Sequence, residues 1–197
     1  MSEYKVIIAR YKEDVSWSKK YNSIVYNKGE DEIESSIRLE NVGRESHSYL
    51  RHVITNYHNL DETLIFLQGN PLEHPINMES LFNIEEKGYS HKVQNLSSDR
   101  WGEHMSNKKD FTISEWKGQI SNPKGYNLGE WWEKTTSEPY QKSPMVFWNA
   151  LFSVKKEFIL KRKLESYISI YNTLLHSSSP VEAHYCERTW FNIFNLC

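Results

Sequence analysis

The first seventy residues alternate short apolar runs with polar turns around one helical repeat, and this order restricts the fold more than any other feature. Residues 5–10 and 23–29 each contain a β-branched apolar run that ends in polar residues. Residues 45–60 place apolar side chains at helical spacing, and residues 64–67 form a third apolar run. Such runs predict buried strands, and helical spacing predicts an amphipathic helix. Strand, loop, strand, helix and strand in this order favour an α/β sheet with parallel pairing.

The rest of the chain predicts an irregular middle and an ordered C-terminal part. The segment 72–140 is polar and contains the tryptophans Trp101, Trp116, Trp131 and Trp132. Because disordered segments are poor in aromatic residues, we interpret it as long functional loops. Residues 145–154 predict a strand, and residues 155–175 predict one long helix. We expect the last helix to begin with a capping box formed by Ser179 and Glu182.

Composition restricts the class of protein. A length of 197 residues favours one domain with a substantial core. The net charge of −2 lacks the basic footprint of a nucleic-acid-binding protein. Only 2 cysteines occur, which is too few for a disulfide framework and typical of a reducing compartment. No run approaches the roughly 18 apolar residues of a membrane span. We therefore expect a cytoplasmic protein without a membrane span.

Cations follow the predicted strands and open the predicted helix. Arg10 and Lys28 lie just past the first and second strands, and Arg44 follows Gly43 at the helix start. Ligands collect at the carboxyl ends of parallel strands, and helix N-termini favour anions. A guanidinium suits a diphosphate or a carboxylate. The pattern predicts a site for a phosphate-bearing small molecule, and the alternative for Arg44 is a surface ion pair with a neighbouring glutamate.

Further polar residues follow the third strand and lie on the last helix. The amides of Gln68 and Asn70 suit hydrogen bonds to a ribose or a base edge, although such residues also form ordinary turns. His184 and Glu187 are three residues apart on one helix face. A carboxylate and an imidazole are the usual groups of general acid–base catalysis. The alternative for Glu187 is a local ion pair with Arg188.

The sequence contains no metal-binding motif of known spacing, no Gly-x-x-x-x-Gly-Lys loop and no Gly-x-Ser-x-Gly elbow. This argues against classical nucleotide hydrolases and serine hydrolases. A metal-dependent hydrolase built on His74, His184 and Glu187 stays open, and it requires these three residues to meet in space.

Several segments together resemble the DUF3431 family, which is known mainly from fungal, microbial and viral sequences and lacks a well-defined activity. The resemblance is carried by residues 8–17, 26–29, 41–50, 53–71 and 180–190. It therefore spans both ends of the chain and is weakest between about residues 75 and 140.

A looser resemblance is to glycosyltransferases of the GT-A type. These enzymes begin with a nucleotide-binding α/β half and place an Asp-x-Asp motif at the end of a central strand. Residues 149–157 look like their later strand-to-helix element. The resemblance implies a single GT-A-like domain over 1–197 with a mostly parallel sheet. Residues 1–71 would form the nucleotide-binding half, 72–140 a tryptophan-rich acceptor side, and 141–197 a strand with two helices.

This second resemblance implies transfer of a sugar from a nucleotide-sugar donor to a glycan or another hydroxyl acceptor. Glu187 would be the base that removes the acceptor proton, with His184 in reserve. The residues expected to bind the nucleotide-sugar are Arg10, Tyr11, Lys28, Arg44, Glu45, Gln68 and Asn70.

The position of the Asp-x-Asp motif is occupied here by Gln68-Gly69-Asn70, which has no carboxylate. Divalent hard cations prefer charged oxygen ligands. The resemblance therefore implies either Mn²⁺ or Mg²⁺ held mainly by the donor diphosphate, or transfer without a metal. A non-catalytic sugar- or nucleotide-binding module is the alternative from another class.

Overall fold

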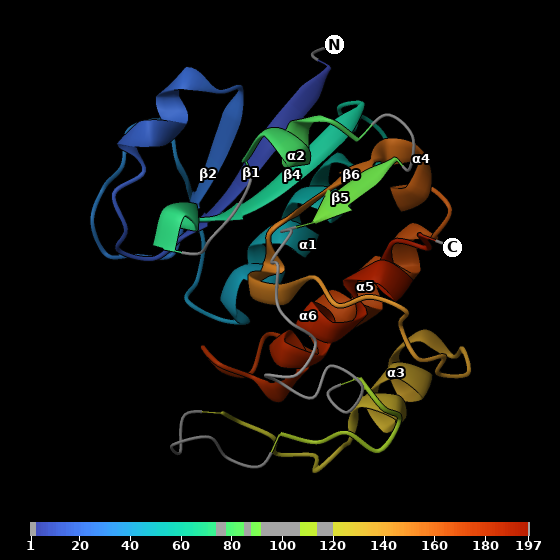
Figure 1. The fold of residues 1–197 in the computed structure, drawn as a ribbon. Helices are drawn as coiled ribbons and strands as arrows, with labels where there is room; N and C mark the ends of the chain where they lie inside the picture. Colours follow the sequence, from blue (N-terminus) through green and yellow to red (C-terminus); the bar gives the residue numbers. More distant parts are fainter. Residues whose placement is uncertain (1–2, 74–77, 85–87, 92–106, 114–119, 197) are drawn as a thin grey trace.

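The fold is built on one six-stranded sheet with the strand order β3-β2-β1-β4-β6-β5 (Figure 1). The computed structural model describes residues 3–73, 78–84, 88–91, 107–113 and 120–196. The strands are β1 (Tyr4–Arg10), β2 (Ser23–Asn27), β3 (Ile37–Arg38), β4 (Thr63–Gln68), β5 (Tyr89–His91) and β6 (Phe152–Lys155). Strands β1 to β4 pair in parallel, whereas β6 is antiparallel to both β4 and β5. The expected α/β class with a mostly parallel sheet is confirmed.

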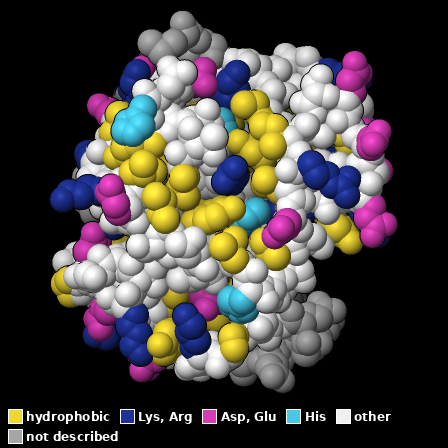
Figure 2. Space-filling model, turned by 180° about the vertical axis from the view of Figure 1, so that it is seen from behind, with side chains coloured by type: hydrophobic (Ala, Val, Ile, Leu, Met, Phe, Trp, Pro, Cys, Tyr) yellow, Lys and Arg dark blue, Asp and Glu magenta, His cyan; other side chains and the backbone are white. Residues whose placement is uncertain are grey.

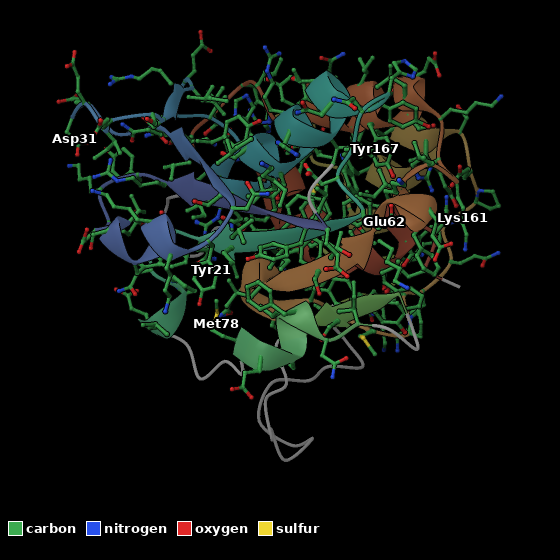
Figure 3. All side chains as sticks on the ribbon, turned by 90° about the horizontal axis from the view of Figure 1, so that it is seen from above. Tyr21, Asp31, Glu62, Met78, Lys161 and Tyr167 are labelled. Atoms are coloured by element: carbon green, nitrogen blue, oxygen red, sulfur yellow. The ribbon has the colours of Figure 1, made fainter. Side chains whose placement is uncertain are left out.

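Helices cover both faces of this sheet unequally. They are α1 (Arg44–Asn56), α2 (Met78–Phe82), α3 (Leu128–Thr136), α4 (Lys156–Ile159), α5 (Leu164–Asn172) and α6 (Val181–Ile193), with 3-10 turns η1 (Ser16–Lys20), η2 (Pro71–Glu73) and η3 (Trp148–Ala150). Helices α1, α5 and α6 lie on one face, and α2 lies on the other (Figure 1). Figure 3 shows this division, with Tyr21 and Met78 on the α2 side and Tyr167 among the helices of the opposite side.

The central strands β1 and β4 are apolar on both faces, which is why their sequences read as continuous runs and not as alternating ones. Val6 and Ile8 belong to the core cluster on the α2 side, whereas Ile7 belongs to the larger cluster under α1, α5 and α6. Aromatic rings fill much of that larger cluster. The Phe152 and Trp190 ring centroids, for example, are 5.4 Å apart. Burial of these rings, and not ligand binding, accounts for many of the aromatic residues.

The predictions of two elements in the C-terminal part are wrong. Of the expected strand 145–154, only 152–154 belongs to β6, because Asn149 and Ala150 turn the chain with positive φ angles of 61° and 52°. The expected long helix is divided into α4 and α5. Arg162 lies between them, where its buried guanidinium donates to the Ile193 carbonyl at 2.9 Å and pairs with Glu138. These contacts hold the chain in a turn between the two helices.

The capping box expected at Ser179 and Glu182 is also wrong. Helix α6 begins at Val181, and the Glu182 carboxylate pairs with His176 at 3.0 Å instead. The Val181 N–H donates to the carbonyl of Ser121, so a backbone contact replaces the side-chain cap. A capping box does occur at the start of α3, between Asn127 and Glu130, within the segment that was expected to form long loops.

The surface carries charges of both signs. Figure 2 shows one face, on which Lys and Arg side chains lie among Asp and Glu while hydrophobic side chains gather across the middle. In the part of the chain that the structure describes, no helix has the length and apolar character needed to cross a bilayer.

Replacing Gly43 by alanine is expected to destabilise the start of α1. Gly43 has a φ of +62°, and a Cβ there would lie 2.7 Å from the Leu174 Cβ. Strain at positive φ and steric overlap together predict a loss of at least about 2 kcal/mol in the free energy of unfolding. Gly125 is the matched control, because its φ is +63° and no atom of another described residue beyond its chain neighbours lies within 4 Å of an added Cβ. Equal losses for the two variants in chemical denaturation would contradict the steric argument.

Acidification is expected to destabilise the protein through His47 and His52 on α1. Burial lowers the pKa of His47 to about 3 and that of His52 to about 4. Below about pH 6.5, the pKa of histidine in the unfolded chain, the unfolded chain binds protons at these two side chains and the folded chain does not. Stability is therefore complete above about pH 6.5 and is lost as pH falls toward the folded pKa values. The slope is about 1.4 kcal/mol per pH unit for each histidine.

Urea unfolding between pH 7.5 and 5 measures this slope. His52→Gln should reduce the slope while lowering stability at pH 7, because the Tyr26 hydroxyl at 3.0 Å loses its imidazole partner. His58→Gln, at an exposed position, is the control. A His52→Gln variant that keeps the full pH slope would rule out this source of acid sensitivity.

Candidate functional site

The strand order places a pocket at the carboxyl ends of β1 and β4. From β1 the chain builds β2 and β3 on one side, and β4 then pairs on the other side of β1. Such a reversal creates a crevice between the two strand ends, which is where open α/β sheets bind ligands. A pocket of about 280 Å³ opens here, lined by Ala9, Arg10, Tyr11, Glu13, Lys28, Asn41, Arg44, Glu45, Gln68 and Ser178. The structure thus brings together six of the seven residues expected to bind a nucleotide-sugar.

Asn70 is the seventh of these residues, and it does not line the pocket. Its side-chain amide donates to the Glu73 carboxylate at 2.8 Å, within the turn that follows β4.

The loops after β1 and β4 are held against each other. The Glu13 carboxylate accepts the Tyr11 N–H at 2.7 Å and packs on Gly69, where an added Cβ would lie 2.7 Å from the Glu13 Oε2. The Trp17 indole donates to the Gly69 carbonyl at 2.9 Å. A side chain at position 69 would push the two loops apart, so Gly69 keeps the crevice narrow.

Arg10 is committed to contacts within the protein. Its buried guanidinium forms a two-pronged pair with Asp31 at 2.9 and 2.6 Å and donates to the Asn27 Oδ1 at 2.8 Å. Its Nε donates to the Glu13 carbonyl at 2.7 Å. The hydrogen bond to Asp31 raises the pKa of Arg10, so the side chain stays charged. Arg10 therefore fixes the loops after β1 and β2 and has few donors left for a ligand.

Lys28 and Arg44 differ in how many of their hydrogen-bond donors the protein already uses. The buried Lys28 ammonium donates to the carbonyls of Val42, at 2.5 Å, and Arg44, and burial lowers the pKa of Lys28 to about 7. Lys28 thereby fixes the chain that enters α1. The Arg44 side chain is 43% exposed, and over the described ranges its one ion pair is a 3.5 Å contact with Glu45. Of the three predicted cations, Arg44 is the one that offers the pocket a largely free guanidinium.

The two residues expected on the last helix lie in a buried cluster beside this pocket. The Glu187 carboxylate accepts the Asn149 N–H at 2.6 Å and lies 3.4 Å from the Arg188 Nη1. Burial raises the pKa of Glu187. Burial, together with the charges of Arg44 and Arg188, lowers the pKa of His184 to about 4, so this imidazole is neutral at pH 7. A carboxylate with a raised pKa and a neutral imidazole are thus available for proton transfer.

Asn149 connects this cluster to the pocket. Its carbonyl accepts the Gln68 side-chain amide at 2.8 Å, while its N–H donates to Glu187. Its φ of 61° is unusual for a residue other than glycine, although asparagine tolerates it better than most. Asn149 was not predicted as a site residue, because a backbone role of this kind leaves no residue-type signal.

Other expected residues lie elsewhere. His74, Trp101 and Trp116 fall outside the described residues. Trp131 and Trp132 are buried in the core, with 1% and 2% of their surface exposed, so they do not line a binding surface. Over the described ranges, no group of three or more His, Cys, Asp and Glu side chains is placed to hold a metal ion.

Comparison with known proteins identifies a family but no characterised relative. No curated protein and no solved structure matches the chain. A model of the family DUF3431, described as a protein of unknown function, matches residues 6–196. Because this match covers nearly the whole chain, the protein belongs to the DUF3431 family.

Proposed function

We propose that the protein binds a nucleotide-sugar in the pocket between β1 and β4 and transfers the sugar to a hydroxyl acceptor, in a GT-A-like arrangement. The observation that carries this proposal is the convergence of six expected binding residues at the switch point of the sheet. The GT-A-like arrangement has separate support from residues 149–157, which contain β6 followed directly by the start of α4.

The wall formed by α1 suits the donor diphosphate. Arg44 is largely free and is the first residue of α1, whose N-cap residue Gly43 has no side chain that could cap the helix. A guanidinium and the positive end of a helix both stabilise the negative charge that develops on a departing diphosphate. Arg44 therefore carries the main electrostatic role, while Arg10 and Lys28 position the loops around it.

Space for a nucleoside adjoins this wall. A second hollow of about 480 Å³ shares Tyr11, Lys28 and Asn41 with the pocket. Tyr11 is 42% exposed, so its ring can stack on a base or a sugar. Together the two hollows reach the size of typical small-molecule sites.

Glu187 is the proposed base, with His184 in reserve. A base needs a pKa raised toward neutrality, and burial produces that shift for Glu187. The hydrogen bond from the Asn149 N–H orients the carboxylate. The proton of the acceptor hydroxyl passes to Glu187 while the oxygen attacks the anomeric carbon and the diphosphate departs.

The role of a metal follows from the donors present. Gln68 is hydrogen-bonded to Asn149, Asn70 lies outside the pocket, and Glu45 is paired with Arg44. We therefore propose that any Mn²⁺ or Mg²⁺ is held mainly by the donor diphosphate, and metal-independent transfer is compatible with the same pocket. With only 2 cysteines in the chain, we propose that the reaction takes place in the cytoplasm.

A non-catalytic nucleotide- or sugar-binding module is the second candidate. It is favoured by the engagement of Arg10 and Lys28 within the protein, which leaves Arg44 as the main cation for a departing diphosphate. This candidate requires ligand binding without turnover, whichever divalent metal is added.

Arg44→Gln is expected to weaken nucleotide-sugar binding. Loss of a charged hydrogen bond of about 1.5–3 kcal/mol corresponds to a roughly tenfold to hundredfold weaker affinity. Thermal shift against nucleotides and nucleotide-sugars, with and without Mn²⁺, identifies the donor, because a ligand at 100 times its Kd adds about 2.7 kcal/mol. Calorimetry then compares the variants. Arg51→Gln, exposed on the same helix, is the control and should bind normally. Unchanged affinity of Arg44→Gln would remove Arg44 from the site.

Glu187→Gln is expected to abolish transfer while donor binding persists. Removing a general base costs about 10²- to 10⁴-fold in turnover. In the wild type, turnover should rise with pH through the raised pKa of Glu187, because the base acts in its deprotonated form. Glu182→Gln is the control, a buried carboxylate on the same helix that pairs with His176. Full turnover in Glu187→Gln would refute this assignment, and absence of turnover in the wild type despite donor binding would favour the binding module.

A further inference from the structure

One edge of the Arg188 guanidinium has no hydrogen-bond partner among the residues that the structure describes. Its Nη1 donates to the His184 carbonyl at 2.9 Å and lies 3.4 Å from the Glu187 Oε2. The Nε is buried and makes no hydrogen bond, and within the described ranges no bond involves the Nη2. The Nε–H and one Nη2–H of a guanidinium point the same way, so this two-donor edge has no partner in the described part of the chain.

This free edge lies in an enclosed position. The guanidinium carbon is 4.8 Å from the Phe111 ring centroid and 5.3 Å from that of Trp148, and the side chain is only 12% exposed. The Nε of this edge is a buried charged donor without a partner, a state that is costly and that native proteins rarely contain. Stacking on two rings holds the guanidinium plane in place without using its N–H groups.

A second unpartnered nitrogen lies one turn earlier on α6. The His184 Nε2 is buried and has no hydrogen-bond partner in the described part of the chain. His184 and Arg188 are four residues apart and therefore share a helix face. The charges of both Arg44 and Arg188 act on His184, so these groups occupy one neighbourhood.

Arg162 shows how the protein treats a guanidinium with a structural role. It is also buried and stacked, with its guanidinium carbon 5.4 Å from the Trp132 ring centroid. Its Nε donates to the Ile193 carbonyl, and its two terminal nitrogens pair with the Glu138 carboxylate at 2.9 and 3.0 Å. In Arg162 the edge that carries the Nε–H is hydrogen-bonded to acceptors of the protein. In Arg188 the same edge has no acceptor among the described residues.

We propose that the free edge of Arg188 binds an oxyanion, a carboxylate or phosphate group carried by the acceptor substrate. Two parallel N–H donors in a fixed plane match the two oxygens of such a group. Arg188 is not among the residues that line the pocket between β1 and β4, so this anion is distinct from the donor diphosphate. The assignment of this anion to the acceptor rests on the proposed function, because Glu187, the proposed base, adjoins Arg188. The existence of the anion site does not depend on the proposed function.

The Nε–H signal of Arg188 in a ¹H–¹⁵N spectrum tests the site directly. The signal is assigned by its loss in Arg188→Lys. A second assignment, which does not require that this variant folds, is the change in its chemical shift in Phe111→Leu, because this substitution removes the ring current of Phe111. Titration with inorganic phosphate at constant ionic strength should shift this signal saturably, and chloride should not. The Arg162 Nε–H is the matched control and should stay in place. Nucleotide and sugar are absent from this experiment, so its outcome does not depend on glycosyl transfer.

Arg44→Gln separates the two anion positions. A phosphate-dependent Arg188 shift that persists in this variant supports the proposal, since the anion then binds at Arg188 itself. No shift, an equal shift of Arg162, or a shift that disappears in Arg44→Gln would overturn it. If the titration confirms the site, the next experiment compares turnover with acceptors that do and do not carry a carboxylate or phosphate. The wild type should turn over the charged acceptor faster than its neutral analogue, and Arg188→Lys should lose this preference. Equal preference in wild type and variant would place the anion on another substrate.

Discussion

The candidate site depends on the parallel pairing of β1 with both β2 and β4. In this register Ala9 lies opposite both Tyr26 and Gln68, so the three strands reach their carboxyl ends at nearly the same level. Apolar side chains bury both faces of β1 and β4, with Val6 and Ile8 in one core cluster and Ile7 in the other. A slip by one residue would exchange the faces and disrupt the packing of both clusters. The hydrophobic core therefore fixes the positions of the polar residues that follow each strand. The pocket is a consequence of the same constraint that stabilises the sheet.

The N-terminal half was predictable from sequence because its signals are local. Apolar runs located β1, β2 and β4, and helical spacing located α1 within a residue or two of its observed start. The C-terminal half was less predictable, because tertiary contacts override local pattern there. The segment 155–175 has the composition of one helix, yet the burial of Arg162 against α6 interrupts it. Likewise, the contact between Val181 and Ser121 decides where α6 begins, and no local pattern reveals a partner sixty residues away.

The residues of the site could be predicted by type and position, but not by their state. Arg10, Lys28 and Arg44 look equivalent in sequence, since each follows a strand or opens a helix. The structure separates them by how many of their donors the protein already uses. Arg10 and Lys28 hold loops in place, and Arg44 remains largely free. Donor occupancy depends on acceptors contributed by distant segments, which is why sequence reasoning also gave Arg188 no role beyond an ion pair with Glu187.

The turn at Asn149 explains how two parts of the site, built on opposite ends of the chain, keep a fixed relation. Gln68 belongs to the N-terminal half and Glu187 to the last helix, and one residue in a left-handed conformation is hydrogen-bonded to both. That conformation costs about 1–2 kcal/mol for a residue other than glycine. Two hydrogen bonds of about 1 kcal/mol each, one of them to a carboxylate, offset this cost. Since an ordinary extended strand through Asn149 would break both bonds, we interpret the late start of β6, at Phe152, as a consequence of this turn and not as a failure of strand propensity.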